Sequence, residues 1–358
     1  MTLAPLDIAR QRLHNERLVG PPCERPEDVV QWLCAVQAQD YAGAKWAVAQ
    51  RTTGVTDADL DRLFNDGKIL RTHVLRPTWH IVMPLDIRWM LELTAPRVNA
   101  ANATMYRKLE LDDAVFARSS GALARALQGG AQLTRTEVAR VYEAAGITAS
   151  GLRLAYLLMR AELDGLLCSG ALRGKQFTYA LLDERVSRTR ALGRDEALAE
   201  LTRRYFASHG PALAKDFAWW SGLTMAEVKA GIELAGTHLE SEVVDGKTYW
   251  RAGGPAANGK LKTPLIHLLP NYDEYVIAYK DHSATLDPAL LSGSSDALMA
   301  HLVVLDGQVV GGWRRNVKGK TVAITLNIPV PLKRGEHAAL QLAIDQYSRF
   351  LGMPVTVA

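Results

Sequence analysis

The stretch Leu133-Thr-Arg-Thr-Glu137 opens the part of the chain whose fold the sequence predicts most clearly. A threonine three residues before a glutamate is typical of a helix N-terminus, and a glycine such as Gly146 is typical of a helix end. The pattern therefore predicts a helix that runs from this stretch through Ala145. Apolar residues at helical spacing predict a second helix over about residues 152–164.

Two short runs follow these helices. Residues 165–170 and 175–181 have the apolar and aromatic content of strands, and Arg173-Gly-Lys175 lies between them as a basic turn. Helix, turn, helix and a two-stranded ribbon in this order predict a winged helix. Winged helices contact DNA in many proteins, but they also occur as modules that only pack against other protein, so the fold alone leaves both uses open.

The same order of elements occurs on both sides of this stretch, as a loose internal repeat. Downstream, the predicted elements are a helix, a second helix that opens at Thr224, and a hairpin with an Asp-Gly turn, over residues 210–222, 224–227 and 240–251. Upstream, they are three helices and a hairpin, over residues 2–12, 28–36, 56–65 and 66–82. Helical connectors over residues 84–128 join the first two copies.

The C-terminal part changes character after a predicted Gly- and Ala-rich linker over residues 252–259. Short β-branched runs separated by Asp-Gly and Lys-Gly turns predict a small antiparallel sheet or barrel, which one helix closes. The predicted elements are strands over residues 263–269, 275–279, 301–305, 308–313 and 321–326 and a helix over 336–351. The predicted fold class is α+β, with three winged-helix units and a β domain, over residues 1–118, 119–190, 191–258 and 259–358.

Composition excludes several classes of protein. The 358 residues carry a net charge of +4, with 48% apolar and 22% charged residues, as folded soluble proteins do. The three cysteines form no Cys-x-x-Cys pair and no nearby histidines have ligand spacing, so we expect reduced thiols and no metal. No apolar run approaches the roughly 20 residues that span a bilayer, and the N-terminus does not resemble a secretion signal, so a cytoplasmic location is expected.

Basic residues concentrate on three predicted hairpins. They are Arg71, His73 and Arg76 on the first, Arg173 and Lys175 on the second, and Arg314, Arg315, Lys318 and Lys320, together with Trp313, on a later one. Such clusters suit contacts with DNA phosphates, which position a protein without reading sequence, and Trp313 would meet a base or a groove. The alternatives are a solvated turn for the later cluster and a packed histidine for His73.

Gln37 and Gln39, in Val36-Gln-Ala-Gln-Asp40, follow an amphipathic stretch. Residues two apart on an α-helix point about 200° away from each other, so the two amides serve one site only if the helix ends near Gln37 and the chain opens out. The alternative is a pair of helix-terminal amides that cap free carbonyls. The neighbouring Asp40 is a rival carboxylate.

A second pair, Asp273-Glu274, invites comparison with the two carboxylates of a glycosidase. On the predicted strand their side chains alternate between faces, so a turn or scaffold role is expected instead. Trp79, Trp219 and Trp220 are expected in the core.

Three segments, in this order, resemble a known family. They are Gln37-Ala-Gln-Asp-Tyr41, Arg71-Thr-His-Val-Leu-Arg-Pro-Thr-Trp-His80, and Leu268-Leu-Pro-Asn-Tyr-Asp-Glu-Tyr-Val276 with Tyr279-Lys-Asp281. They resemble the winged-helix DNA glycosylases of the AlkZ type, and the resemblance covers essentially the whole chain. A bacterial branch of that family has Gln-x-Asp at the first segment, where this chain has Gln39.

The resemblance implies three tandem winged helices and a β domain that form a C-shaped basic channel for double-stranded DNA. It also implies excision of N7-alkylated purines and unhooking of interstrand crosslinks, as in azinomycin self-resistance and base excision repair. Gln37 and Gln39 would be the catalytic residues. No metal or organic cofactor is expected, and the protein is expected to act as a monomer.

The amide pair fits such a substrate on chemical grounds. Hydrolysis of an ordinary N-glycosidic bond needs an acid for the leaving base and a carboxylate for the cationic sugar. An N7-alkylated purine is already cationic and leaves as a neutral base, so what remains is to hold a water and to stabilise positive charge at C1′, which two preorganised carbonyls can do. We therefore expect a monofunctional glycosylase with a shallow, open site. The alternatives are a non-catalytic winged-helix transcriptional regulator and a scaffold for protein partners.

Overall fold

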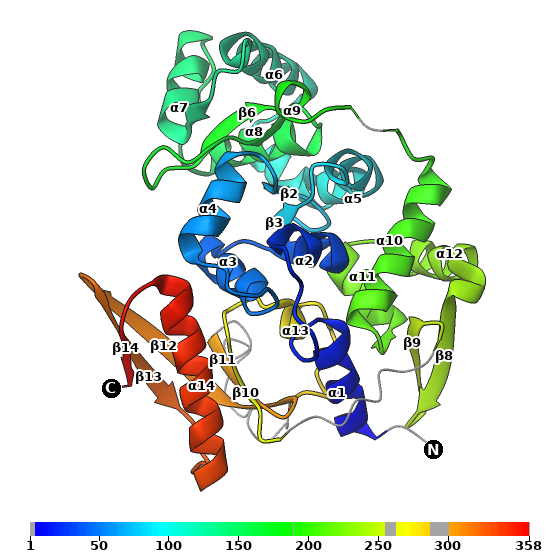
Figure 1. Cartoon of the computed structure of the whole chain (residues 1–358). Coiled ribbons are helices and arrows are strands. Elements are labelled where there is room, and N and C mark those ends of the chain that lie inside the picture. The colour runs from blue at the N-terminus through cyan, green and yellow to red at the C-terminus, as the bar shows by residue number, and fades with distance from the viewer. Residues whose placement is uncertain (1–3, 189, 255–262, 287–300, 358) are drawn as a thin grey trace. The chain divides into compact units, whose positions relative to one another are not determined.

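The computed structural model describes residues 4–188, 190–254, 263–286 and 301–357 (Figure 1). The chain divides into two compact units. Unit 1 comprises Met1–Leu60, Ala199–Trp220 and Thr224–Ala358, and unit 2 comprises Asp61–Leu198 and Ser221–Leu223. Three of the divisions fall within helices, α4 (Asp57–Asn65), α10 (Arg194–His209) and α11 (Ala214–Ser221), and the fourth falls between Leu223 and Thr224.

Unit 1 contains the two ends of the chain and a sheet near its C-terminus. Its elements, besides parts of the three shared helices, are α1 (Pro5–Asn15), α2 (Pro26–Leu33), β1 (Ala35–Gln37), α3 (Tyr41–Ala49), β7 (Ala212–Leu213), α12 (Met225–Ala235), a 3-10 helix (Gly236–His238), β8 (Leu239–Val244), β9 (Lys247–Ala252), β10 (Ile266–Leu269), α13 (Glu274–Ile277), β11 (His301–Leu305), β12 (Gln308–Lys318), β13 (Thr321–Asn327), α14 (Arg334–Leu351) and β14 (Val355–Val357).

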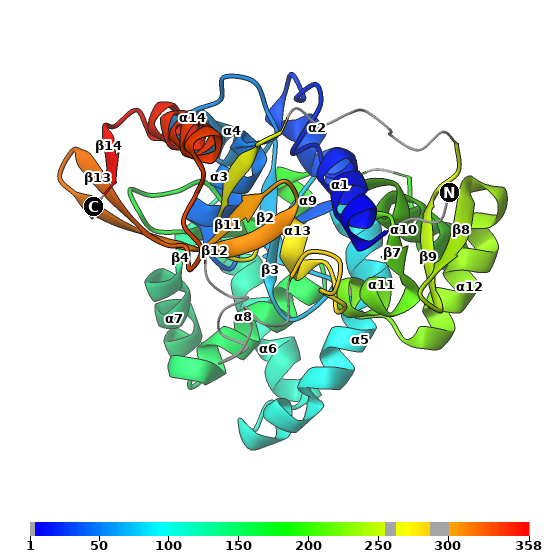
Figure 2. The same ribbon diagram turned by 90° about the horizontal axis from the view of Figure 1, so that it is seen from below.

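The sheet has five strands in the order β10-β11-β12-β13-β14. Neighbours are antiparallel except β13 and β14, which are parallel. Figures 1 and 2 show β12 and β13 as a long hairpin that extends beyond the shorter strands. Helix α14 buries a face at helical spacing that includes Leu340, Ile344 and Tyr347, and the Tyr347 ring meets Trp46 of α3 at 4.9 Å and Trp313 of β12 at 5.3 Å between centroids. This aromatic cluster joins α3 to the sheet.

Unit 2 is mainly helical. Its elements are β2 (Leu70–His73), β3 (Trp79–Val82), α5 (Ile87–Lys108), α6 (Asp113–Leu127), β4 (Leu133–Thr134), α7 (Arg135–Ala144), α8 (Gly151–Leu163), β5 (Leu167–Ser169), β6 (Thr178–Leu181) and α9 (Leu182–Arg185). Strands β2 and β3 form an antiparallel hairpin, and β4, β6 and β5 form a sheet in that order. A core of buried apolar residues from α5 to α8 and β5, including Leu123, Tyr142 and Leu157, holds this unit together.

One order of elements occurs three times along the chain. A helix, a short strand, two helices and two strands follow one another from α2 to β3, from α6 to β6, and from α10 to β9. The sheet orders β4-β6-β5 and β7-β9-β8 also correspond. In the second and third copies one helix opens with the predicted capping box: Thr134 with Glu137 opens α7, and Thr224 with Glu227 opens α12.

Several predicted elements are confirmed closely. They include α7, α8, α12 and α14, the hairpin of β8 and β9 with its Asp245-Gly246 turn, and the strands β10, β11, β12 and β13. Residues 2 and 3 of the first predicted helix and residues 255–259 of the predicted linker lie outside the described residues.

Two predictions about secondary structure are wrong. The expected strand over residues 275–279 is instead the helix α13, because Asp273 caps it by accepting the Tyr275 N–H at 3.0 Å and the β-branched run continues as a buried turn. Helix α3 was not expected, since Tyr41-Ala-Gly43 gives no amphipathic signal, and seven of its nine residues are buried. No helix in the described ranges is long and apolar enough to cross a membrane.

Candidate active site

Gln37 and Gln39 lie on an extended link between two helices of unit 1. Helix α2 ends at Leu33, and Cys34 takes a positive φ of 71°, which a helix cannot continue through. The chain is extended over β1 and then enters α3, which Asp40 caps by accepting the Gly43 N–H at 3.1 Å. The condition for the two amides to serve one site is met, since the chain opens out after a helix that ends three residues before its predicted end at Val36. Because neither glutamine lies at the C-terminal end of a helix, the helix-capping alternative does not apply.

The two amides have different surroundings. Gln37 is 5% exposed, and among the described residues its Oε1 has no hydrogen-bond partner. Gln39 is exposed, and Ala38 between them is fully buried. A buried polar atom without a partner costs about 1–3 kcal/mol of stability. Gln37 Oε1 is therefore an acceptor that the fold leaves available at this segment.

A buried carboxylate holds the backbone of Gln37. Glu274, the first residue of α13, is 1% exposed, and its Oε1 accepts the Gln37 N–H at 2.7 Å. Its Oε2 accepts the indole N–H of Trp220 at 2.9 Å, and His209 Nε2 lies 3.6 Å from the same oxygen. The prediction that Asp273 and Glu274 lie on opposite faces of a strand is thus wrong in its geometry, since both belong to a helix start.

Asp273 belongs to a separate buried ion cluster with Arg51 and Glu16. Both Asp273 oxygens accept from the Arg51 guanidinium, at 2.8 and 2.9 Å, and Glu16 Oε2 accepts from it at 3.1 Å. All three side chains are at most 1% exposed. Burial raises the pKa of Glu16 to about 8, although Arg51 opposes the rise, because the cluster has one cation for two carboxylates.

Further oxygen acceptors gather at the start of α3. A Cβ on Gly43 would lie 3.1 Å from both Asp40 Oδ2 and Asn271 Oδ1, so the glycine leaves room between these oxygens. Asn271 Oδ1 is buried and has no hydrogen-bond partner within the described ranges. The Asn271 N–H donates to His301 Nδ1 at 2.8 Å, and burial lowers the pKa of His301, which keeps this nitrogen an acceptor. The next residue, Tyr272, has a positive φ of 63°, a strain often found at functional sites.

Asn271 was not among the residues predicted for the site. It lies inside the segment 268–276 that carries the family resemblance, but only the structure shows its amide oxygen beside Asp40. Gln37 Oε1 and Asn271 Oδ1 are both unpartnered oxygen acceptors among the described residues, and such acceptors suit a positively charged reacting sugar.

The predicted DNA contacts on the first hairpin are largely buried. Arg71 is 9% exposed, with its guanidinium 4.2 Å from the Trp79 ring centroid and 4.5 Å from that of Phe177. His73 is 4% exposed and pairs through Nδ1 with Glu162. Both expectations of DNA contact are corrected: these side chains pack inside unit 2, because aromatic and acidic partners from distant parts of the chain cover them.

The other unit 2 residues predicted to contact DNA lie nearer the surface. Arg76 is half-buried. Arg173 and Lys175 are exposed on the turn between β5 and β6, and Arg173 forms an ion pair with Glu137 at 2.7 Å. A paired, exposed arginine can still exchange its partner for a phosphate, since surface ion pairs are weak.

The residues predicted to contact DNA on the hairpin of β12 and β13 differ in exposure. Trp313 is 2% exposed, donates its indole N–H to Leu269 O at 2.8 Å and stacks on His301, so the expectation that it meets a base or a groove is wrong. Arg315 is half-buried and donates to the Tyr347 hydroxyl at 2.6 Å. Arg314, Lys318 and Lys320 are exposed toward the tip. The hairpin therefore has an anchored base and a basic end.

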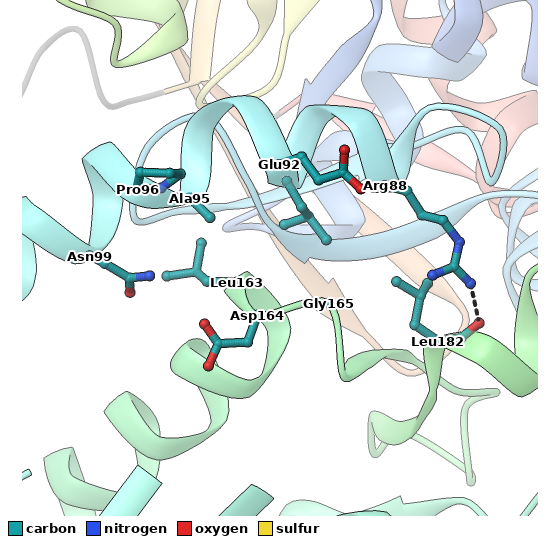
Figure 3. Close-up of a pocket in the computed structure, with 10 residues that line it drawn as sticks. Arg88, Glu92, Ala95, Pro96, Asn99, Leu163, Asp164, Gly165 and Leu182 are labelled. Carbon is teal, nitrogen blue, oxygen red and sulfur yellow. Dashed lines mark hydrogen bonds between the residues drawn. The ribbon is translucent and has the colours of Figure 1, made fainter. Parts of the chain in front are cut away.

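A pocket of about 320 Å³ in unit 2 is a poor alternative site. Figure 3 shows Arg88 reaching the carbonyl of Leu182, with Glu92, Asn99 and Asp164 along the rest of the lining. Arg88 also pairs with Asp183 at 2.8 Å, and the two acidic lining residues would repel phosphate. None of the predicted site residues lines it. Among the described residues, no three His, Cys, Asp or Glu side chains gather in a way that could hold a metal ion.

Comparison with known proteins identifies the class of enzyme. The family model "DNA glycosylase AlkZ-like" matches residues 30–350, so the chain belongs to the AlkZ-like DNA glycosylase family and is a DNA glycosylase. The interstrand DNA cross-link repair glycosylase of Streptomyces sahachiroi is 27% identical to it over 305 residues, which are 80% of this chain and 81% of that protein. The solved structure of Streptomyces sahachiroi DNA glycosylase AlkZ matches its fold with a TM-score of 0.81 at 21% identity, covering 100% of both chains.

Proposed function

We propose that this DNA glycosylase hydrolyses the N-glycosidic bond of N7-alkylated purines in double-stranded DNA. Gln37 and Gln39 hold the attacking water on the sugar face opposite the departing base and stabilise the cationic sugar through their carbonyl dipoles. The alkylated base leaves as a neutral purine, so the site needs no acid for it. Asp40 is occupied as the cap of α3, which supports the amides rather than this carboxylate as the reacting groups.

The observation that carries the proposal is the buried, unpartnered Oε1 of Gln37, two residues before the exposed Gln39 on the same extended link. In the described ranges Gln37 Oε1 accepts no hydrogen bond, so it is available to a water or to the developing charge at C1′. The unpartnered Asn271 Oδ1 supports the same placement of positive charge. An enzyme for undamaged nucleotides would need a leaving-group acid here, and the amides cannot supply one.

We propose that the three repeated sets of helices and strands act as winged helices that grip double-stranded DNA, one chain sufficing. The exposed cations Arg314, Lys318 and Lys320, with Arg173 and Lys175, would contact phosphates. The role of the Streptomyces sahachiroi relative in interstrand cross-link repair extends the proposal to crosslinks made through alkylated purines. A crosslinked base is tethered to the other strand, so an exposed amide such as Gln39 suits it better than an enclosed pocket.

The proposal is tested with a duplex that carries a single N7-methylguanine. Wild-type protein should release the free base and leave an abasic site, which alkali converts into a strand break. The same duplex with guanine should stay intact, because a neutral purine has no acid to help it leave. Release of the base from both duplexes at similar rates would contradict the proposal that the enzyme acts on bases that already carry a positive charge.

A duplex crosslinked through N7 of two guanines tests the extension. Unhooking should appear as recovery of separated strands on a denaturing gel. Activity on N7-methylguanine without any unhooking would contradict the extension and leave the first proposal standing.

A further inference from the structure

The backbone of Gln37 is held by a side chain that lies 237 residues further along the chain. Strand N–H groups ordinarily donate to backbone carbonyls of a neighbouring strand, but this one donates to the Glu274 carboxylate at 2.7 Å. That is the short distance of a charge-assisted hydrogen bond. Glu274 thus fixes the main chain at the residue whose side-chain oxygen is unpartnered.

Both oxygens of Glu274 are needed as acceptors. Oε1 accepts from Gln37 and Oε2 accepts from the Trp220 indole, and both of these partners are donors that cannot accept. A glutamine at position 274 has one acceptor oxygen and one amide nitrogen. The oxygen can accept from one of the two N–H groups. The amide NH2 group then faces the other N–H group, and two donors cannot form a hydrogen bond with each other.

The neighbouring carboxylate provides a natural comparison. Asp273 is 2% exposed, against 1% for Glu274, and lies one residue away. Its side chain caps α13 and binds Arg51, whereas the Glu274 side chain binds Gln37. Removal of either carboxylate should lower stability, but Glu274 is the one that bonds directly to the segment of the amide pair.

We propose that Glu274 is a positioning residue for base release, which acts by fixing the Gln37 backbone while Trp220 fixes Glu274. The inference rests on the proposed role of Gln37. A reacting group must be held closely, since a displacement of about 1 Å can cost 100-fold in rate. Trp220 and His209 are both fully buried, so they restrict movement of the Glu274 carboxylate.

The test measures single-turnover release of N7-methylguanine together with the dissociation constant for the same duplex. Rates are expressed per folded molecule, from a thermal unfolding curve of each variant. Glu274→Gln should lower the rate constant by about 10- to 100-fold, with the dissociation constant within about threefold of wild type. Asp273→Asn, the matched control, should lose stability but keep its rate.

A second variant separates positioning from general damage. Trp220→Phe removes the competing indole N–H and keeps an aromatic ring. In the double variant Glu274→Gln/Trp220→Phe, the new amide oxygen can therefore accept from the Gln37 N–H. The amide nitrogen can then face His209 Nε2. The double variant should recover the rate of Trp220→Phe to within about threefold. In a Gln37→Ala background, Glu274→Gln should cost no further rate, because it acts through Gln37.

The inference would be overturned by an unimpaired Glu274→Gln, by an equal rate reduction in Asp273→Asn, or by a full further rate reduction when Glu274→Gln is added to Gln37→Ala. Absence of rescue by Trp220→Phe would also overturn it. An inactive wild type would instead contradict the proposed function, so the two failures are distinguishable.

Discussion

Gln37 combines a cost to the fold with an expected benefit to catalysis. Its buried Oε1 has no partner within the described residues, and removing such an atom relieves its desolvation penalty. We predict that Gln37→Met raises the free energy of unfolding by about 1 kcal/mol while it lowers the rate of base release. Urea unfolding and the single-turnover assay measure the two effects. A variant that loses both stability and activity would contradict this interpretation of Oε1.

Arg51 is the cation of the buried ion cluster next to the site. Its guanidinium is fully buried and pairs with both Asp273 and Glu16. Removing it leaves buried carboxylates uncompensated, so Arg51→Met should cost about 3–5 kcal/mol of unfolding free energy at pH 8. The exposed pair of Arg173 and Glu137 offers a control, and Arg173→Met should cost less than about 1 kcal/mol. Similar destabilisation of the two variants in urea would show that burial does not set the cost.

Glu16 makes the same cluster sensitive to pH. Its pKa in the folded protein is raised to about 8, from an ordinary value of 4.5, by burial. A carboxyl with a raised pKa binds its proton more tightly when folded, so its contribution is complete below pH 4.5 and disappears as pH rises through about 8. We predict that stability falls between about pH 5 and pH 8 and that Glu16→Gln flattens this fall. Parallel pH profiles for the two proteins would contradict the raised pKa.

At the scale of elements, the sequence predicted those with local signals. The Thr224–Glu227 capping box and the Asp245-Gly246 turn each determine structure through neighbouring residues, and both appear as expected. The prediction of a strand after Asp273 was wrong, because β-branched residues fit a buried helix start as well as a strand once a cap is present. Helix α3 forms through burial of small residues and Trp46, which no periodic pattern announces.

The hairpin of β12 and β13 has exposed positive charge that can be tested for DNA contact. Its exposed Arg314, Lys318 and Lys320 should each release counterions on binding if they contact phosphates. Replacing all three with alanine should reduce the slope of log affinity against log salt by about 0.9 for each phosphate that is no longer neutralised. The swap Arg314→Lys/Lys318→Arg/Lys320→Arg keeps the charge and should keep the slope. An unchanged slope in the alanine variant, measured by fluorescence anisotropy, would exclude the hairpin from the interface.

At the scale of the whole molecule, the order of the helices and strands could be predicted from the sequence, whereas the contacts between residues far apart in the chain could not. The repeated sequence of helices and strands follows from turn and cap signals spread over the whole length. The burial of Arg71 against Phe177 and the bond between Gln37 and Glu274 join residues that lie far apart in the chain. Single-residue chemistry cannot foresee such partners, so the basic residues of the first hairpin looked available for DNA. The sequence identified Gln37 and Gln39 as candidates, but it did not identify Glu274 as the residue that holds the Gln37 backbone.

By the proposed mechanism, two uncharged amides catalyse departure of a base that already carries positive charge. The measurement that tests this most directly is single-turnover release of N7-methylguanine by wild type and by the Gln37→Ala/Gln39→Ala variant, with the affinity of each for the duplex. We predict a reduction of at least about 100-fold in rate with affinity within about threefold. A double variant that still releases the base at the wild-type rate would contradict the mechanism.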